Sequence, residues 1–259
     1  MPRLAVVCNR PSRPVVAAVA LLLLTGCATS GPNHVYATLD GDPALHDVGP
    51  QPRNLAHAVA AGERVLGLAY DFNTDHLFLR LAPAQVIRVI ERPSGKVLRE
   101  MPLPAELKTE NPADLAIRSG DRHLFAVGPD GRAVVELSLF GEYLRHINLT
   151  GLEGPVGGLA YDQKADRLLV LTAASPAATR IGSVGPDGHV TYYVTLAAPV
   201  SGVSLGYDSD AQHFFVPLAE GNKVGEFDAA GALVATLQPG DGGPVTALDA
   251  GPRSFVRVF

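Results

Sequence analysis

The chain has 259 residues, of which 47% are hydrophobic and 18% are charged, with 27 Gly, 21 Pro, two Cys and no Trp. This balance excludes a disordered chain, and two cysteines exclude both a disulfide framework and a cysteine-rich metal site. The formal net charge of −5 argues against nucleic-acid binding, and the many Gly and Pro favour a turn-rich β protein over a helical bundle.

Residues 1–26 have the pattern of a secretory signal peptide. Three arginines give a basic start, and residues 15–24 form an unbroken apolar run. Ten residues are too few to cross a hydrocarbon core about 30 Å thick, but they fit the core of a signal peptide. The run ends in Leu24-Thr25-Gly26-Cys27, which resembles the lipobox of bacterial lipoproteins. An ordinary secretory signal with a chance cysteine is the alternative.

The lipobox resemblance implies cleavage before Cys27 and attachment of a diacylglyceryl group and an N-acyl chain, such as palmitate, to that residue. Several acyl chains give lasting membrane anchoring. Ala28 after the cysteine implies, by the same resemblance, transfer to the outer membrane. Residues 27–33 are then a lipidated tether for a periplasm-facing domain, residues 34–259. The mature chain carries 18 Lys and Arg against 26 Asp and Glu, so we expect no nucleic-acid partner.

A short pattern recurs along the rest of the chain. Residues 67–71 (GLAYD) are repeated at 158–162 (GLAYD) and 204–208 (SLGYD), with degenerate copies at 114–117 and 246–249. The leucines at 68, 115, 159 and 205 are 47, 44 and 46 residues apart. Each copy predicts a short buried strand, a polar turn and a second apolar strand.

A second hairpin follows each of the first four copies and turns at a glycine. These glycines are Gly95, Gly141, Gly188 and Gly231. Four strands in about 45 residues are typical of one blade of a β-propeller. The predicted blades cover residues 65–108, 112–155, 156–199 and 200–243.

The fifth copy predicts a closing blade shared by the two ends of the chain. We expect the inner two strands from residues 246–249 and 254–258, and the outer two from residues 35–48, with Gly41 as the hairpin glycine. The predicted fold is therefore all-β, a single propeller of five four-stranded blades with a composite closing blade; six blades are the alternative. Such closure leaves no free edge between first and last blades.

The hairpin at residues 224–234 ends a strand in Phe227-Asp228 before its glycine. In this it resembles the NHL and YVTN families of propeller repeats. The resemblance implies the propeller architecture over residues 34–259 and says little about function. Those families more often have six or seven blades, so five is a departure from them.

Three motifs suggest chemistry, and each has a simpler interpretation. Residues 202–206 match GxSxG, but Ser204 lies inside a predicted first strand and not in a strand-to-helix turn. Residues 71–75 (DFNTD) resemble the start of a calcium loop, yet lack its turn glycine and later Glu, so we interpret them as a capped turn. Three histidines, His76, His123 and His213, share one repeat position, which favours a structural role.

Irregular loops at one face of the ring are the predicted interaction surface. This face carries the loops between blades and the loops between second and third strands, and ligand pockets usually lie there. Residue 34 is expected to begin a third strand, so the tether is predicted to leave from this face. The candidate partner-contacting residues on these loops are Asn111, Asp114, Arg132, Glu220, Asn222, Lys223 and Asp241. No catalytic, cofactor-binding or metal-binding residue is assigned.

The sequence favours a non-enzymatic binding or scaffold propeller, anchored to the membrane by lipid and contacting an envelope protein. The alternatives are a propeller hydrolase or lactonase, and a small-molecule sensor in the periplasm. Lactonases of this architecture hold a metal with convergent Glu, Asn and Asp side chains. Here the candidates Glu110, Asn111, Glu220 and Asn222 come from only two loops.

Overall fold

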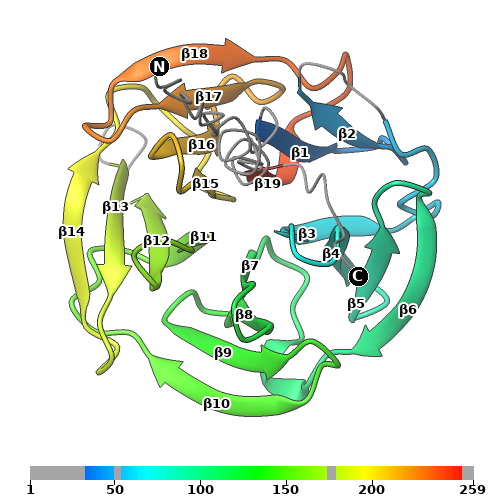
Figure 1. The fold of residues 1–259 in the computed structure, drawn as a ribbon, viewed down its shortest axis with the longest axis horizontal. Helices are drawn as coiled ribbons and strands as arrows, with labels where there is room; N and C mark the ends of the chain where they lie inside the picture. The colour runs from blue at the N-terminus through cyan, green and yellow to red at the C-terminus, as the bar shows by residue number, and fades with distance from the viewer. Residues whose placement is uncertain (1–32, 50–53, 174–178, 253–259) are drawn as a thin grey trace, which may run out of the picture. The chain divides into compact units, whose positions relative to one another are not determined.

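In the computed structural model, residues 33–49, 54–173 and 179–252 are described. They form five antiparallel β-sheets arranged as the blades of a ring, numbered below in chain order (Figure 1). The predicted signal peptide and Cys27 lie outside the described residues. Within the described residues, no helix has the length and apolar character needed to cross a membrane.

Four blades consist of four consecutive strands, named A to D from the axis outward. Blade 1 has β3 (Arg64–Asp71), β4 (His76–Ala82), β5 (Val86–Glu91) and β6 (Lys96–Pro102), followed by the 3₁₀ turn η1 (Ala105–Leu107). Blade 2 has β7 (Leu115–Arg118), β8 (His123–Val127), β9 (Ala133–Ser138) and β10 (Tyr143–Asn148). Blade 3 has β11 (Val156–Asp162), β12 (Arg167–Ala173), β13 (Thr179–Val184) and β14 (Val190–Thr195). Blade 4 has β15 (Gly206–Asp208), β16 (His213–Pro217), β17 (Val224–Phe227) and β18 (Leu233–Leu237).

Blade 5 closes the ring with strands from both ends of the described chain. Its order is β19 (Val245–Pro252), β1 (Asn33–Leu39) and β2 (Leu45–Val48), and Leu55 adds a single bridge to Leu45 outside β2. The predicted five-bladed propeller with a composite closing blade is thereby confirmed. Five blades, and not six, complete the ring.

The predicted division of strands within blade 5 was wrong. We expected two strands from each end, but β1 pairs directly with β19, from Asn33 opposite Pro252 to Leu39 opposite Val245. Residues 35–39 are thus the second strand of the blade and not the third. Gly41 therefore turns between the second and third strands, where its φ of +75° requires glycine. The two strands pair at seven positions, with one bulge between Thr38 and Leu39, so no other strand lies between them. Residues 254–258 lie outside the described residues.

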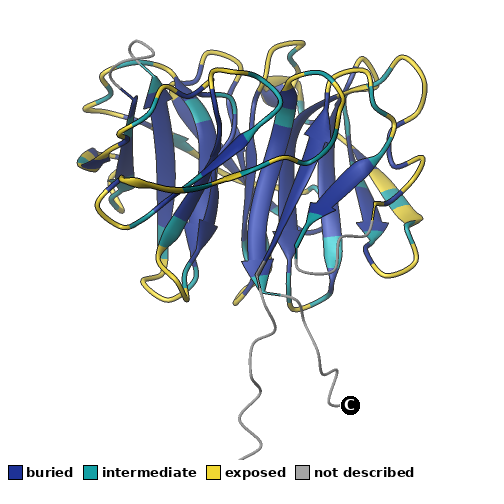
Figure 2. Cartoon of the chain, turned by 90° about the horizontal axis from the view of Figure 1, so that it is seen from above, coloured by how far each residue is buried: buried dark blue, intermediate teal, exposed yellow. Residues whose placement is uncertain are grey.

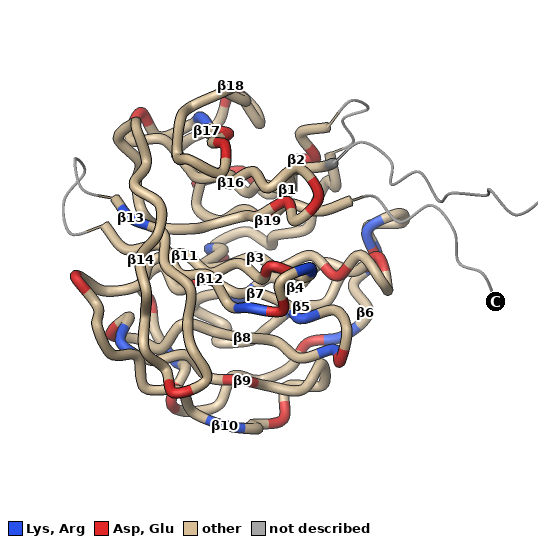
Figure 3. Tube along the Cα trace, turned by 60° about the vertical axis from the view of Figure 1, so that its left-hand side comes forward, with Lys and Arg blue, Asp and Glu red and all other residues tan. Residues whose placement is uncertain are grey.

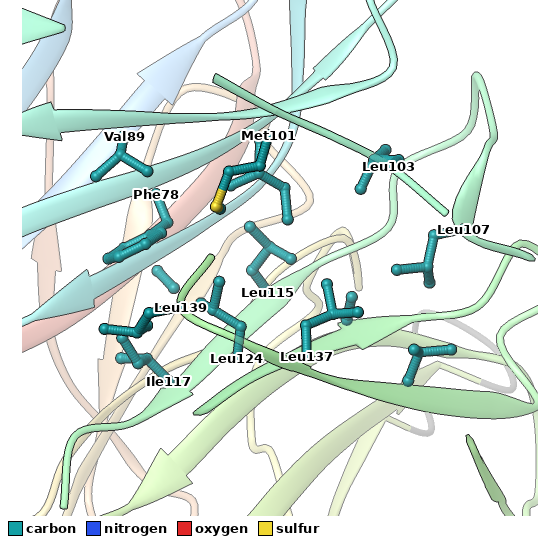
Figure 4. Packing of buried hydrophobic residues seen from close by; sticks show 14 residues of the cluster. Phe78, Val89, Met101, Leu103, Leu107, Leu115, Ile117, Leu124, Leu137 and Leu139 are labelled. Carbon is teal, nitrogen blue, oxygen red and sulfur yellow. The ribbon is translucent and has the colours of Figure 1, made fainter. Parts of the chain in front are cut away.

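The hydrophobic core lies between neighbouring blades. One cluster, for example, joins Phe78 and Val89 of blade 1 to Leu115, Leu124 and Leu137 of blade 2 (Figure 4). The facing sides of these blades carry mainly Leu, with Val, Ile, Ala and Phe, and the two sheets pack through these side chains. Because every blade is covered on both faces by its neighbours, the strands are almost wholly buried and the exposed residues concentrate in turns and outer strands (Figure 2).

Antiparallel connection sends alternate turns to opposite faces of the ring. We call one the AB face: it carries the turns between strands A and B, residues 72–75, 119–122, 163–166 and 209–212. The other, the DA face, carries the loops between blades and the turns between strands B and C. In blade 5 the A–B connection is replaced by the ends of β19 and β1, so the described chain starts at the AB face.

Candidate functional site

The centre of the ring is closed by backbone. The A strands carry small residues where they approach one another, and a Cβ added at Gly67 would lie 2.6 Å from the carbonyl oxygen of Ala113. At Gly158 it would lie 2.7 Å from the backbone of Ser204. Only glycine permits this approach of backbones. The axis at this level therefore has no space for a ligand.

A buried carboxylate fills the axis at the same level. Asp114 precedes β7 and is fully buried. Its Oδ2 accepts hydrogen bonds from Leu159 N (2.9 Å), Leu205 N (3.0 Å) and the Ser204 hydroxyl (3.0 Å), and Oδ1 accepts from Leu68 N at 3.4 Å. The A strand is the inner edge of each blade, so its outward amides have no neighbouring strand to bond with. The Asp114 side chain accepts hydrogen bonds from such amides in three other blades. Burial raises the pKa of Asp114 well above its usual range.

We call Asp114 and the A-strand backbones that converge around it the plug. Ser204 of the GxSxG match belongs to this plug. It is fully buried, and its hydroxyl also accepts a hydrogen bond from Leu248 N at 3.0 Å. One side chain thus connects blades 2, 4 and 5. A serine enclosed in this way has a structural role.

Arg80 completes the closed level. It is fully buried and donates to the carbonyl oxygens of Val127 (2.7 Å), Ala113 (3.2 Å) and Leu107. Burial lowers the pKa of Arg80 to about 10, although the charge of Asp114 acts in the opposite direction. The guanidinium therefore ties blade 1 to the loop that leads into blade 2.

Above the plug, towards the AB face, the axis opens into a cavity of about 250 Å³. Five of its lining residues occupy one repeat position, two residues after the conserved leucine of each A strand. They are Tyr70, Ile117, Tyr161, Tyr207 and Ala250. Three blades supply a tyrosine ring and blade 2 an isoleucine, whereas blade 5 supplies only a methyl group. Blade 5 therefore contributes the smallest side chain at this position of the cavity wall.

The tyrosine hydroxyls are held by the A–B turns. Tyr70 Oη donates to Asp75 Oδ1 at 2.9 Å, and Tyr161 Oη donates to Asp166 Oδ1 at 2.7 Å. Both aspartates adopt left-handed backbone, with φ of 59° and 51°, which Asp tolerates better than most residues. Burial raises the pKa of Tyr161 to about 12. With these hydroxyls occupied, the rings supply mainly apolar surface to the cavity.

Three aspartates line the cavity, Asp208, Asp210 and Asp249. Asp208 Oδ1 accepts hydrogen bonds from the amides of Asp210 and Ala211, and Asp210 pairs with Lys164. The third carboxyl group is that of Asp249. Its oxygens accept hydrogen bonds from Tyr70 N and Ala250 N, each at 2.8 Å. Burial raises the pKa of Asp249 to about 7, against the effect of these two bonds. A carboxyl group that titrates near neutral pH can donate or accept a hydrogen bond there, so Asp249 is the polar group of the candidate site that can do both.

The mouth of the cavity is bordered by the A–B turns, which are linked to one another. Asn73 Nδ2 donates to Ser119 O (2.8 Å), Ser119 N donates to Gln163 Oε1 (3.1 Å), and Gln163 N donates to Ser209 Oγ (3.0 Å). The series joins blades 1 to 4. At blade 5 the lining residue is Pro252, which pairs with Asn33.

The seven residues predicted from sequence as a partner surface do not form one site. Asp114 is enclosed at the axis, so it is not available to a partner and this part of the prediction was wrong. The other six lie in loops of the DA face, where they are exposed or half-buried: Asn111, Arg132, Glu220, Asn222, Lys223 and Asp241. None of them lines the axial cavity. A second cavity on the DA face, about 640 Å³, is lined instead by residues 39–43, 57, 59–65 and 246.

The repeated histidines pair with acidic residues of the next strand. The nitrogen-to-oxygen distance is 2.7 Å for His123 and Glu136 and 2.6 Å for His213 and Glu226. His34 of blade 5 makes the same contact with Asp47 at 2.5 Å. These contacts support the structural role predicted from the repeat.

The calcium-like segment is a capped turn. Asp71 accepts from Asn73 N and Thr74 Oγ1, and Asp75 pairs with Arg92 at 2.5 Å. Within the described residues, no group of three or more His, Cys, Asp or Glu side chains is placed to hold a metal ion.

Solved structures share the fold. A chain of the nidogen/laminin complex aligns with a TM-score of 0.62 and 12% identity, over 86% of this chain and all of the other. A protein of unknown function from Bacteroides caccae has a TM-score of 0.46 and 13% identity, over 85% of this chain and 99% of the other. No family model and no curated protein sequence matches the chain. The likeness supports a β-propeller and leaves the NHL or YVTN type a prediction.

Sequence reasoning missed Asp249, although the repeat contains a signal for it. The residue after the conserved leucine is small in blades 1 to 4, being Ala69, Ala116, Ala160 and Gly206. In blade 5 it is Asp249. A carboxylate close to the axis, at a position where the other copies have a small residue, indicates a special role. Asp114, which directly precedes the leucine of its own copy, is a second example.

Proposed function

We propose that this protein is a lipid-anchored binding propeller of the bacterial envelope whose axial cavity holds a small, largely apolar molecule. The observation that supports it is the cavity of about 250 Å³, whose wall combines tyrosine and isoleucine side chains with polar groups that include the carboxyl group of Asp249. Apolar walls with few polar groups are typical of small-molecule sites. For scale, a cavity of about 150 Å³ binds benzene.

The carboxyl group of Asp249 restricts the chemistry of the ligand. Asp249 retains lone pairs besides those used by Tyr70 N and Ala250 N. A ligand with one hydroxyl or amide group satisfies it, whereas an anion meets a carboxyl group that is itself partly ionised at pH 7. We therefore expect a neutral molecule of one or two rings, or a short chain, with one hydrogen-bonding group.

The lipid anchor is part of the same proposal. The lipobox-like Leu24-Thr25-Gly26-Cys27, the residue Ala28 and the tether 27–33 support an outer-membrane lipoprotein that faces the periplasm, with residues 34–259 as its domain. A protein partner of the envelope is the second candidate, supported by the exposed charged loops of the DA face around Arg132 and Asp241.

Differential scanning calorimetry tests the cavity. The full-length protein is reconstituted in phosphatidylcholine vesicles, and 1-naphthol or 1-octanol is added. A ligand that binds the folded state alone raises Tm with its concentration. We expect this rise in the native protein and its loss in Ala250→Ile, which gives blade 5 the side chain that blade 2 has at Ile117.

Lys223→Ala is the matched control, because Lys223 lies on the DA face and pairs only at the surface with Glu220. This variant should retain the full rise in Tm. An equal rise in Ala250→Ile would place the bound molecule elsewhere and contradict the proposal, as would no saturable rise with either probe.

A further inference from the structure

The chain enters the ring beside the mouth of the cavity. Asn33, the first described residue, pairs with Pro252, which lines the cavity on the AB face. The sequence pattern predicts the tether at the opposite face, because residues 35–39 resemble a third strand. As the second strand of blade 5, this segment begins where the A–B turns lie. The cavity and the start of the described chain therefore share one face.

The tether is too short to reach the other face. Six residue steps separate Cys27 from Asn33, and such a segment spans about 20 Å when fully extended. The A strands β3 and β11 have 8 and 7 residues, which at about 3.3 Å per residue makes each about 23–26 Å long. A path to the DA face must cover that height and also pass around the outer strands. The axis itself is closed by Asp114 and the A-strand backbones.

On the AB face, several charged side chains pair with neighbours of opposite sign. Lys164 at the cavity mouth pairs with Asp210 at 2.6 Å, and Arg118 pairs with Asp121 at 2.5 Å. Lys and Arg are interspersed with Asp and Glu over the whole ring (Figure 3). Phe72, half-buried in an A–B turn, and Pro252 supply apolar surface at the mouth.

We infer that the AB face lies against the lipid bilayer, so that the cavity opens towards the membrane and takes up molecules that partition into lipid. This inference rests on the lipid anchor of the proposed function. It gives the ligand a source: a molecule that leaves the outer part of the bilayer meets the tyrosine-lined mouth first, whereas one from the periplasm must enter at the side of the ring.

The chain contains no Trp, so single tryptophans report the orientation. Phe72→Trp and Lys164→Trp place the probe on the AB face, in the A–B turns of blades 1 and 3. Arg132→Trp places it in a B–C turn of the DA face. Each full-length variant is reconstituted in phosphatidylcholine vesicles with and without phosphatidylcholine that carries a nitroxide on its head group.

We expect the nitroxide lipid to quench both AB-face tryptophans and to leave the DA-face tryptophan at its unquenched intensity. Insertion of 20 Gly and Ser residues after Ser30 should reduce the quenching at both AB-face positions, because a long flexible tether frees the ring to turn. Quenching of Arg132→Trp equal to that of the AB-face probes would overturn the inference. Quenching at position 72 without quenching at position 164 would also overturn it, since the ring would then stand on its edge.

Flotation and mass spectrometry separate this inference from the proposed function. If Cys27 is acylated and the protein floats with vesicles but the AB-face probes are unquenched, the inference fails while the anchor stands. If Cys27 is unmodified and the protein does not float, both fail. If it is unmodified, yet the protein floats and shows the expected quenching, the anchor fails and contact of the AB face with lipid stands.

Discussion

Two levels of the ring axis carry a buried aspartate, and they differ in what surrounds it. At the closed level, Asp114 accepts from three backbone amides and the Ser204 hydroxyl, with glycines on the strands beside it. At the open level, Asp249 accepts from two amides and faces a cavity. The first is saturated by protein donors and the second retains hydrogen-bonding capacity for a ligand.

The difference originates in side-chain volume and not in backbone. At the level of Asp114 the repeat position is Gly, Gly, Ser or Ala in the other blades, so the backbones converge. Three residues further along, the position is Tyr, Ile, Tyr or Tyr in four blades, which holds the centre apart, and Ala250 in the fifth. At this position blade 5 therefore contributes a much smaller side chain to the wall of the site than the other four blades do.

Removal of the Asp114 carboxylate should have the largest effect on the free energy of unfolding. Asp114→Ala leaves the backbone amides of Leu68, Leu159 and Leu205 at the axis without their acceptor, whereas the Ser204 hydroxyl still reaches the carbonyl oxygen of Leu248. We expect a loss of about 3–5 kcal/mol in the free energy of unfolding, measured by urea denaturation. Asp114→Asn, which keeps one acceptor oxygen, should lose less. A loss below about 1 kcal/mol for the alanine variant would contradict the role of the plug.

Substitutions that enlarge a side chain should have the next largest effect, and they should destabilise the closed level more than the open one. In Gly67→Ala the new methyl group meets the Ala113 carbonyl oxygen at 2.6 Å, and we expect a loss of about 1–3 kcal/mol. In Ala250→Ile the added carbons enter the cavity, and the loss should stay below about 1 kcal/mol although the side chain is larger. Thermal unfolding of both variants gives the comparison. A larger loss for Ala250→Ile would mean that the open level is as tightly packed as the closed one.

The ionisation of Asp249, at the open level, should make the free energy of unfolding depend on pH. The pKa of Asp249 is about 7 in the folded protein, against roughly 3.9 in an unfolded chain. Between these values the folded state holds a proton that the unfolded state lacks, so the free energy of unfolding falls as pH rises from 4 to 7 and is level above it.

Asp249→Asn removes this titration. The native protein loses stability as the pH rises from 4 to 8, and the variant does not. The difference in the free energy of unfolding between variant and native protein should therefore shift in favour of the variant by up to about 4 kcal/mol over this range. Urea denaturation at a series of pH values measures the difference. A constant difference across that range would show that Asp249 does not titrate there, and Lys223→Ala serves as a control that leaves the pH profile unchanged.

The sequence predicted the blades because one leucine-centred pattern recurs at nearly constant spacing, and spacing is a property of the repeat alone. It misassigned blade 5 because residues 254–258 and 35–39 both have strand-like patterns, and composition cannot decide which of them pairs with residues 245–252. The tether was consequently assigned to the wrong face.

The candidate site was less accessible from the sequence. Asp114 was taken for a loop residue because it precedes a strand and is charged, whereas its burial follows from contacts with three other blades. Those contacts have sequence separations of 46, 45 and 91 residues, and no local pattern encodes them. Asp249 and Ala250 could have been found by aligning the five copies and examining the departures from the consensus.

The position of the chain ends has a consequence for how the ring could be rewired. Because β19 ends beside the start of β1, blade 5 has a break at the place where each other blade has an A–B turn of four residues. The protein is in effect one of five circular permutants of the same ring. A short linker across that break, with new ends opened in the turn at residues 163–166, should preserve the fold while moving the point of attachment to the far side of the same cavity. With the membrane anchor that we propose, attachment at any of the five turns would hold the same face to the membrane, so the inferred orientation would belong to the ring and not to the blade in which the described chain begins.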